Sequence, residues 1–236
     1  MVQKRTRDDA GVRTTGLRTQ AQSKARAHSA EDKQQVRAAF IAVGRQLLAS
    51  HDPAQVSLRR IATEAGYSPA TIYQYFEDQR ALFLAIREQD MTTAVEVFER
   101  VAARTRDPER RVRNVFIGAV KYWLKHLDHF QALFSSPPNQ LPMRTKEGVP
   151  FGRSPIVIRS YALYETIVRQ LFETYPRPPL PVKLATDSLI AATHGIVSFP
   201  MHTRGMDWSD TLKMAECVVD ALLDDWRRQS VERQSD

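Results

Sequence analysis

The feature that most constrains this chain is a helical spacing of its apolar residues, which persists from residue 29 to the C-terminal region. Apolar side chains recur three and four residues apart, and prolines or polar capping residues separate the segments that carry them. No stretch alternates polar and apolar residues for long enough to form a sheet, and glycine is scarce. The sequence therefore predicts an all-α protein with about nine helices.

Composition limits the class of protein further. The 236 residues, of which 42% are hydrophobic, suffice to bury a core without disulfides or metals. The single cysteine excludes a disulfide within the chain and fits a reducing compartment. The longest uncharged run, residues 188–203, is too short and too polar to span a bilayer. We therefore expect a cytoplasmic protein without a membrane-spanning segment.

Positive charge is concentrated at the N-terminus. The chain has a formal net charge of +7, and residues 1–28 hold seven basic and two acidic residues. This segment has few apolar residues and no periodicity, so we expect a basic tail that is disordered in isolation. Residues 29–80 carry no net charge and residues 81–236 carry +2. A basic tail favours a polyanionic partner, and its deletion should lower both the affinity for nucleic acid and the salt dependence of binding.

Residues 58–77, LRRIATEAGYSPATIYQYFE, satisfy the steric demands of a helix-turn-helix. Ala62 is small where two helices would cross, and Gly66 permits a left-handed backbone at the turn. Ser68 is placed to cap the second helix, which is expected to run to about Phe76, with Pro69 at its first position, where the missing N–H costs nothing. An ordinary helical hairpin within a core is the alternative interpretation.

A longer pattern surrounds this motif and reads Ile61-Ala62-x-x-Ala65-Gly66-Tyr67-Ser68-x-x-Thr71-Ile72-Tyr73-x-Tyr75-Phe76. It resembles the DNA-binding segment of the tetracycline-repressor (TetR) family of bacterial transcription regulators. The resemblance implies a helix-turn-helix domain at residues 29–80, followed by a helical ligand-binding and dimerisation domain at residues 81–236. The family usually has a phosphate-holding lysine three residues after the phenylalanine, whereas this chain has Gln79, followed by Arg80.

The second helix of the motif is expected to enter the major groove of double-stranded DNA and to present its N-terminal side chains to base edges. These side chains include no lysine or arginine for a guanine contact, whereas Gln74 suits adenine and Ala70 or Thr71 suits the thymine methyl. We therefore expect an operator with A·T pairs at the directly read positions. The predicted contacts with bases or phosphates are Lys33, Arg59, Arg60, Ser68, Pro69, Ala70, Thr71, Tyr73, Gln74, Tyr75 and Arg80. Packing within the core is an equal alternative for Tyr75.

A single motif reads too few base pairs to select one genomic site, so the protein is expected to act as a homodimer on a palindrome. The last two predicted helices contain small residues that permit close approach and bulky residues that fill an interface. The predicted interface residues are Ala185, Ser188, Ala192, Leu212, Val219, Leu222 and Trp226. The alternative is that this apolar stripe only fills the core of one protomer.

Aromatic residues are frequent between the motif and the predicted interface. The family resemblance implies that these helices enclose a pocket for a small inducer. The inducer would shift the population toward a conformation with lower affinity for DNA. An apolar or aromatic ligand fits such a composition. The candidate pocket residues are Trp123, Tyr161, Tyr164 and His194.

Sequence signals for catalysis, cofactors and metals are weak or missing. Glycine-rich phosphate loops, nucleophile elbows and nucleotide fingerprints are absent from the sequence, so no catalytic residue and no cofactor is assigned. His126 and His129 have a spacing that could bind a metal, but a solvated helix end is the simpler interpretation. The sequence thus favours a TetR-like repressor released by a small ligand. The alternatives are a ligand-independent DNA-binding dimer and a helical enzyme or partner-binding protein.

Overall fold

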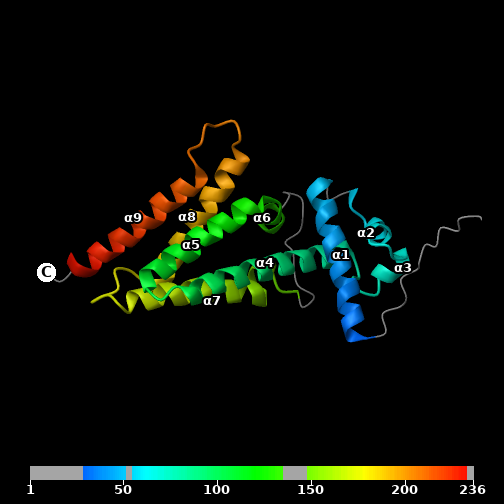
Figure 1. Cartoon of the computed structure of the whole chain (residues 1–236), viewed down its shortest axis with the longest axis horizontal. Coiled ribbons are helices and arrows are strands. Elements are labelled where there is room, and N and C mark those ends of the chain that lie inside the picture. The colour runs from blue at the N-terminus through cyan, green and yellow to red at the C-terminus, as the bar shows by residue number, and fades with distance from the viewer. Residues whose placement is uncertain (1–28, 52–54, 135–147, 233–236) are drawn as a thin grey trace, which may run out of the picture.

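The computed structural model describes residues 29–51, 55–134 and 148–232 (Figure 1). These residues form nine α-helices and one 3₁₀ turn, which confirms the prediction of an all-α fold. In chain order the elements are α1 (Ala30–Ser50), α2 (Leu58–Glu64), α3 (Pro69–Ile72), α4 (Gln79–Arg104), α5 (Pro108–Lys125), α6 (Leu127–Phe134), η2 (Phe151–Arg153), α7 (Pro155–Phe172), α8 (Val182–His202) and α9 (Thr211–Glu232). The predicted basic tail, residues 1–28, lies outside the described residues.

Polar caps set the starts of several helices. The Ser29 hydroxyl accepts a hydrogen bond from the backbone N–H of Asp32 (3.0 Å), and the Asp32 carboxylate accepts one from the N–H of Ser29 (3.1 Å). The Asp107 carboxylate accepts from the N–H of Arg110 (2.7 Å), and Pro108 follows at the first helical position. These contacts satisfy backbone donors that have no partner within the helix, and both helices begin where the sequence predicts.

The buried apolar residues form two clusters that share α4. The first, in the N-terminal unit, lies among α1, α2, α3 and the first two turns of α4, where Phe40, Ile61, Ile72 and Leu82 are fully buried. The second begins at Met91 of α4 and extends through α5 to α9. The expected division after residue 80 therefore falls at the start of α4. Because this helix is continuous and contributes to both clusters, it joins the two units without a flexible linker.

Figure 1 shows the small N-terminal unit at one end of an elongated molecule. From this unit α4 extends into the body, where α5 contacts α4, α7, α8 and α9. The helices α8 and α9 lie against each other on one side of the body, and α9 ends far from the N-terminal unit. None of the described helices is both long and apolar enough to cross a membrane.

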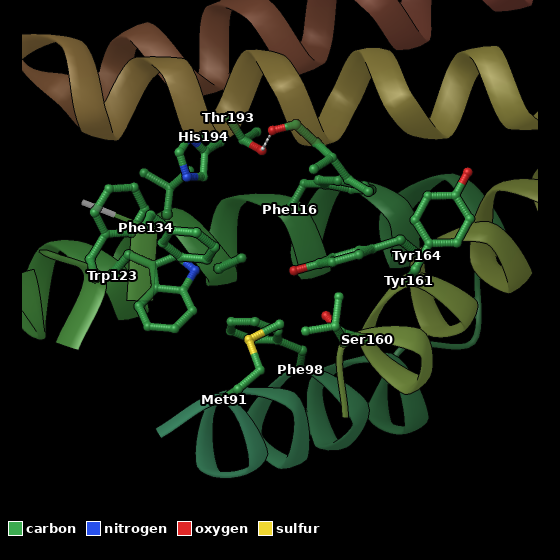
Figure 2. Close-up of a pocket in the computed structure, with 15 residues that line it drawn as sticks. Met91, Phe98, Phe116, Trp123, Phe134, Ser160, Tyr161, Tyr164, Thr193 and His194 are labelled. Carbon is green, nitrogen blue, oxygen red and sulfur yellow. Dashed lines mark hydrogen bonds between the residues drawn. The ribbon is translucent and has the colours of Figure 1, made fainter. Parts of the chain in front are cut away.

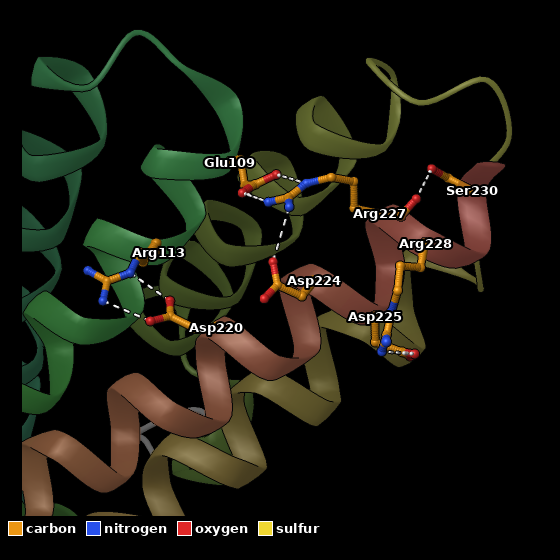
Figure 3. A network of polar contacts seen from close by, with 8 residues as sticks. All are labelled: Glu109, Arg113, Asp220, Asp224, Asp225, Arg227, Arg228 and Ser230. Carbon is orange, nitrogen blue, oxygen red and sulfur yellow. Dashed lines mark hydrogen bonds and ion pairs between the residues drawn. The ribbon is translucent and has the colours of Figure 1, made fainter. Parts of the chain in front are cut away.

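Ion pairs connect α9 to α5 at the surface of the body (Figure 3). The Arg113 guanidinium donates to both carboxylate oxygens of Asp220, at 2.6 and 3.0 Å. Arg227 pairs with Glu109 of α5 and with Asp224 of its own helix. All these side chains are partly exposed, so each pair contributes about 1 kcal/mol or less. The apolar contacts of α9 with the body therefore contribute more to its position.

Candidate functional site

The turn between α2 and α3 has the backbone that a helix-turn-helix requires. Gly66 has a φ of +79°, in the left-handed region that glycine adopts without steric strain. The N–H of Tyr67 donates to the carbonyl of Ala62 (2.9 Å), and the N–H of Gly66 donates to that of Thr63 (3.0 Å). Ala62 is fully buried, as the close crossing of two helices demands. The sequence motif thus folds into two short helices that meet at a sharp turn.

The second helix of the motif is shorter than predicted. The helix α3 covers only Pro69–Ile72, whereas the sequence predicts a helix to about Phe76. Beyond it the N–H of Gln74 donates three residues back to the carbonyl of Thr71 (3.1 Å), a 3₁₀-type bond. The chain tightens here because Phe76, only 2% exposed, must turn back into the core. We call residues 68–75 the recognition segment.

The outer surface of the recognition segment consists of uncharged side chains. Ala70, Tyr73 and Gln74 are exposed, and Pro69 and Thr71 are half-buried beside them. Because none of these side chains is charged, the segment can contact another molecule only through hydrogen bonds and apolar contact.

Two of the predicted contact residues are engaged within the protein. The sequence predicts that the Ser68 hydroxyl caps α3, but in the structure this hydroxyl forms no hydrogen bond with the backbone of the helix. It lies 2.8 Å from the hydroxyl of Thr71, and this contact between side chains replaces the expected bond with a backbone N–H of the helix. The ring of Tyr75 is half-buried and packs edge-on against Phe40, with 5.6 Å between ring centroids. This geometry favours the packing alternative for Tyr75.

The basic residues of the N-terminal unit differ in how free their charges are. Lys33, Arg59 and Arg80 are exposed on the surface of this unit. In contrast, the Nε of Arg60 donates to the carboxylate of Glu64 at 2.9 Å. This contact offsets the positive charge of Arg60, so we expect a weaker phosphate contact there than at the three exposed residues.

Gln79, which replaces the lysine expected from the family resemblance, holds the start of α4 in place. Its side-chain amide donates to the backbone carbonyl of Val56 at 2.6 Å. Asp78 caps α4 by accepting from the N–H of Ala81 (2.7 Å), and Glu77 precedes it. The start of α4 therefore carries negative charge, which opposes a phosphate at the helix terminus. A phosphate contact near this point depends on the Arg80 side chain.

A cavity of about 190 Å³ lies in the body among α4, α5, α6, α7 and α8 (Figure 2). Its lining residues are Met91, Phe98, Phe116, Ala119, Val120, Trp123, Phe130, Phe134, Val157, Ser160, Tyr161, Tyr164, Ile190, Thr193 and His194. All four candidate pocket residues lie in this set. The others, including Met91, Ser160 and Thr193, come from helix faces whose convergence no single helical pattern reveals.

Figure 2 shows how the polar side chains of the cavity are directed. The Tyr164 hydroxyl points into the cavity, and burial raises the pKa of this phenol. The Tyr161 hydroxyl points away and donates to the carboxylate of Asp187 at 2.9 Å. The imidazole of His194 packs against Phe134, with 4.6 Å between ring centroids, and burial lowers the pKa of His194. Both shifts favour the uncharged forms, so the polar groups of the cavity are neutral at neutral pH.

A second depression, which we call the α8–α9 groove, lies open on the surface of these two helices and the turn between them. Its lining residues are Ala191, Ala192, Gly195, Ile196, Phe199, Pro200, Trp208, Met214 and Val218. None of these side chains is charged, and Phe199 is 57% exposed. The groove is therefore an apolar surface that the described residues of one protomer leave open.

The predicted interface residues divide into two groups. Four of them are partly exposed, namely Ser188, Ala192, Leu212 and Leu222, and one of these, Ala192, lines the groove. The other three, Ala185, Val219 and Trp226, are no more than 2% exposed and lie in the core of the protomer. Because the protomer itself covers these three side chains, they cannot contact a second copy. For them the alternative of a protomer core applies, since α8 and α9 are apolar on more than one face.

A buried ion pair lies where the N-terminal unit meets the body. Asp90 of α4 is 1% exposed and pairs with Arg45 of α1. The Nδ1 of His129 on α6 lies 3.6 Å from the same carboxylate. Burial raises the pKa of Asp90, and the contact with Arg45 opposes this shift. Met91 and Phe130, the chain neighbours of Asp90 and His129, line the cavity. Within the described parts of the chain, no group of three or more potential ligands is arranged to hold a metal.

Comparison with known proteins concerns first the N-terminal unit. Residues 40–86 match the family model described as "Bacterial regulatory proteins, tetR family". The matched segment includes the second half of α1, the helix-turn-helix and the start of α4. No curated protein sequence matches the chain.

Solved structures resemble the whole fold. The transcriptional regulator FadR from Bacillus subtilis, in complex with stearoyl-CoA, matches with a TM-score of 0.64 and 14% identity over 79% of this chain and 97% of that chain. A transcriptional regulator of the TetR/AcrR family from Thermobifida fusca matches with a TM-score of 0.62 and 20% identity over 82% and 100%. The fatty acid degradation regulator FadR from Bacillus halodurans matches with a TM-score of 0.63 and 17% identity over 79% and 94%. At these identities the likeness is one of fold.

Proposed function

Because this chain belongs to the TetR family of bacterial regulatory proteins, we propose that it is a repressor that binds a palindromic operator as a homodimer and leaves it when a small molecule binds. The observation that carries the proposal is the recognition segment, exposed at one end of the molecule and joined to the cavity by one continuous helix. We place this activity in the cytoplasm, where a reducing environment suits the single cysteine. The family consists of transcriptional regulators and gives no support to an enzyme.

The exposed side chains of the recognition segment support reading of A·T pairs. Gln74 can bond to both N6 and N7 of adenine, and Ala70 offers an apolar contact to the thymine methyl. The hydroxyl of Tyr73, which is 53% exposed, can donate a hydrogen bond to a phosphate. Lys33, Arg59 and Arg80 supply positive charge that would position the unit on the backbone without specifying sequence.

The α8–α9 groove supports a homodimer. A second copy placed by a twofold axis would cover the groove with the same apolar surface of its own α8 and α9. Ala192 and Gly195 allow the backbones to approach, while Ile196, Phe199 and Val218 supply apolar area. Two recognition segments would then reach two half-sites of a palindrome, which multiplies the specificity of one.

The cavity supports release by a ligand. It opens among five helices, of which α4 also packs into the N-terminal unit. A molecule that binds more tightly to one orientation of α4 would shift the population toward that orientation. If that orientation misplaces the recognition segments, the affinity for the operator falls. FadR from Bacillus subtilis, which has a similar fold, was solved in complex with a small molecule, stearoyl-CoA.

Selection of bound sequences from random DNA tests the proposal. We expect a palindrome with A·T pairs at the directly read positions of each half-site. Gln74→Ala should then weaken binding by about 1–3 kcal/mol and relax the preference for adenine at one position. Gln89→Ala, an exposed glutamine on α4 outside the recognition segment, is the matched control. A dimer that protects no particular sequence, or an operator with only G·C pairs at these positions, would contradict the proposal.

A further inference from the structure

We propose that the cavity takes an uncharged compound of one or two aromatic rings with a hydrogen-bond acceptor facing Tyr164, and that it rejects carboxylates and long acyl chains. This inference rests on the proposed function in one respect, namely that the cavity is the ligand site. It adds the chemical class of the ligand, which the fold alone leaves open.

The size of the cavity limits the ligand. An apolar protein cavity of ~150 Å³ binds benzene, and this cavity of about 190 Å³ is only moderately larger. It therefore holds one ring with substituents, or two fused rings. A stearoyl chain has about three times as many carbon atoms as benzene, so the cavity cannot enclose it without a rearrangement of the lining helices.

The charge of the lining limits the ligand further. Among the described residues that line the cavity, none is Asp, Glu, Lys or Arg. Two acidic groups beside lining residues have partners of their own, since Asp187, which accepts from Tyr161, pairs with Lys183 at the surface and Asp90 pairs with Arg45. A carboxylate in the cavity would lose its hydration without gaining a cation from these residues, which opposes its binding. A neutral ring loses little hydration and gains the aromatic contacts of the walls.

Several polar groups of the cavity form no hydrogen bond with the described residues, namely the hydroxyls of Tyr164 and Ser160, the Trp123 indole N–H and the His194 imidazole. Among the described residues, none forms a hydrogen bond with the Tyr164 hydroxyl, which points into the cavity (Figure 2). Its ring is held by stacking on Phe116, with 4.8 Å between centroids and 28° between planes. The phenol oxygen is therefore fixed in place, and because its hydrogen can rotate toward a partner, a carbonyl or similar acceptor on the ligand would satisfy it.

The aromatic walls select the rest of the ligand. Trp123 and Phe98 line the cavity near Tyr164, with 6.2 Å between their ring centroids and a nearly perpendicular contact. His194 and Phe134 form a second edge-on pair in the lining. Aromatic rings of this kind bind another ring by offset stacking or by edge contact. A planar ring with a neutral acceptor matches both the walls and the donor hydroxyl of Tyr164.

Calorimetric titration of the full chain with three probes of similar shape tests the proposal. Acetophenone is neutral and has an acceptor, ethylbenzene lacks the acceptor, and benzoate is an anion at pH 7.5. We expect acetophenone to bind most tightly, benzoate to bind at least about tenfold more weakly, and stearoyl-CoA not to bind. Benzoate binding as tightly as acetophenone, saturable binding of stearoyl-CoA, or failure of all three small probes to bind would overturn the proposal.

Substitution of the donor provides the second readout. Tyr164→Phe should weaken acetophenone binding about three- to tenfold, the usual range for one neutral hydrogen bond, and leave ethylbenzene binding unchanged. Tyr175→Phe is the matched control, because this half-buried tyrosine lies outside the cavity. An equal loss for both probes would overturn the role of the hydroxyl. These titrations contain no DNA, so a failure of operator binding would leave their result intact.

Discussion

At the residue scale, the recognition segment depends on a backbone that only glycine adopts easily. Gly66 is exposed, and a side chain added at this position would meet no neighbouring atom within 4 Å. Any cost of a substitution there comes from the positive φ. In the left-handed conformation, the Cβ atom of a residue other than glycine lies too close to the following carbonyl oxygen.

Gly66→Ala should lower the free energy of unfolding by about 1–2 kcal/mol, the cost of the left-handed conformation. Gly205→Ala is the control, since Gly205 is also exposed and open but lacks a positive φ. Denaturant titrations of both variants measure the difference. Equal stability of the two variants would show that the turn relaxes at no cost.

His194 shows how a single buried residue makes stability depend on pH. Burial lowers its pKa below the ordinary value of 6.5, so the unfolded chain binds a proton more readily than the native chain below that pH. The stability that neutral His194 contributes is therefore fully present above pH 6.5. It is lost as the pH falls through the lower pKa that His194 has in the native state.

His194→Asn removes this titration and should abolish that part of the pH dependence. Between about pH 7.5 and pH 5.5, the wild type should lose stability relative to the variant. Urea unfolding of both proteins at several pH values gives the comparison. A difference in stability that stays constant over this range would mean that His194 has the same pKa in the native and unfolded chains.

At the scale of elements, α4 and α6 each carry neighbouring residues with different roles. On α4, Met91 lines the cavity while Asp90 pairs with Arg45 of α1; on α6, Phe130 lines the cavity while His129 approaches Asp90. A ligand that moves either helix therefore displaces the buried ion pair. This arrangement supplies a physical route from the cavity to the N-terminal unit.

Arg45→Met should lower the free energy of unfolding by about 3–5 kcal/mol at neutral pH, because it leaves the Asp90 carboxylate buried without its cation. The loss should shrink as the pH falls, since protonation of Asp90 removes the buried charge. Adding Asp90→Asn to the variant should restore most of the stability at neutral pH.

Arg100→Met replaces an exposed arginine of α4, the helix that carries Asp90, and serves as control for these unfolding measurements. It should change the free energy of unfolding by about 0.5 kcal/mol or less. If Arg45→Met were no more destabilising than this control, the pair would have no role in joining the units.

At the scale of the whole molecule, we expect the α8–α9 groove to form the interface of the proposed homodimer. Phe199→Glu places a charge in this apolar surface and should convert the dimer to a monomer, because a buried unpaired carboxylate opposes association. Ile158→Glu is the control, since Ile158 is 59% exposed on α7 and lies outside the groove. Sedimentation at several protein concentrations measures the assembly. A Phe199→Glu protein that still sediments as a dimer would place the interface elsewhere.

The sequence alone identified the features whose signals are local. The helices at Ser29 and Asp107 begin as predicted because a cap acts through hydrogen bonds within one turn. The helix-turn-helix was evident for the same reason, since its small residue and left-handed glycine lie close together in the chain. The length of α3 was overestimated because the return of Phe76 to the core, and not the propensity of the segment, ends the helix.

Sequence by itself determined that this chain is all-α and carries a TetR-type helix-turn-helix, because periodicity, caps and turns are properties of neighbouring residues. Only the tertiary structure decided which apolar faces turn inward. It buried Ala185, Val219 and Trp226 within the protomer and left the α8–α9 groove exposed. It also directed the Tyr164 hydroxyl into the cavity and the Tyr161 hydroxyl away from it. A helix with two apolar faces has the same periodic signal for both, so contacts between distant segments must choose between them.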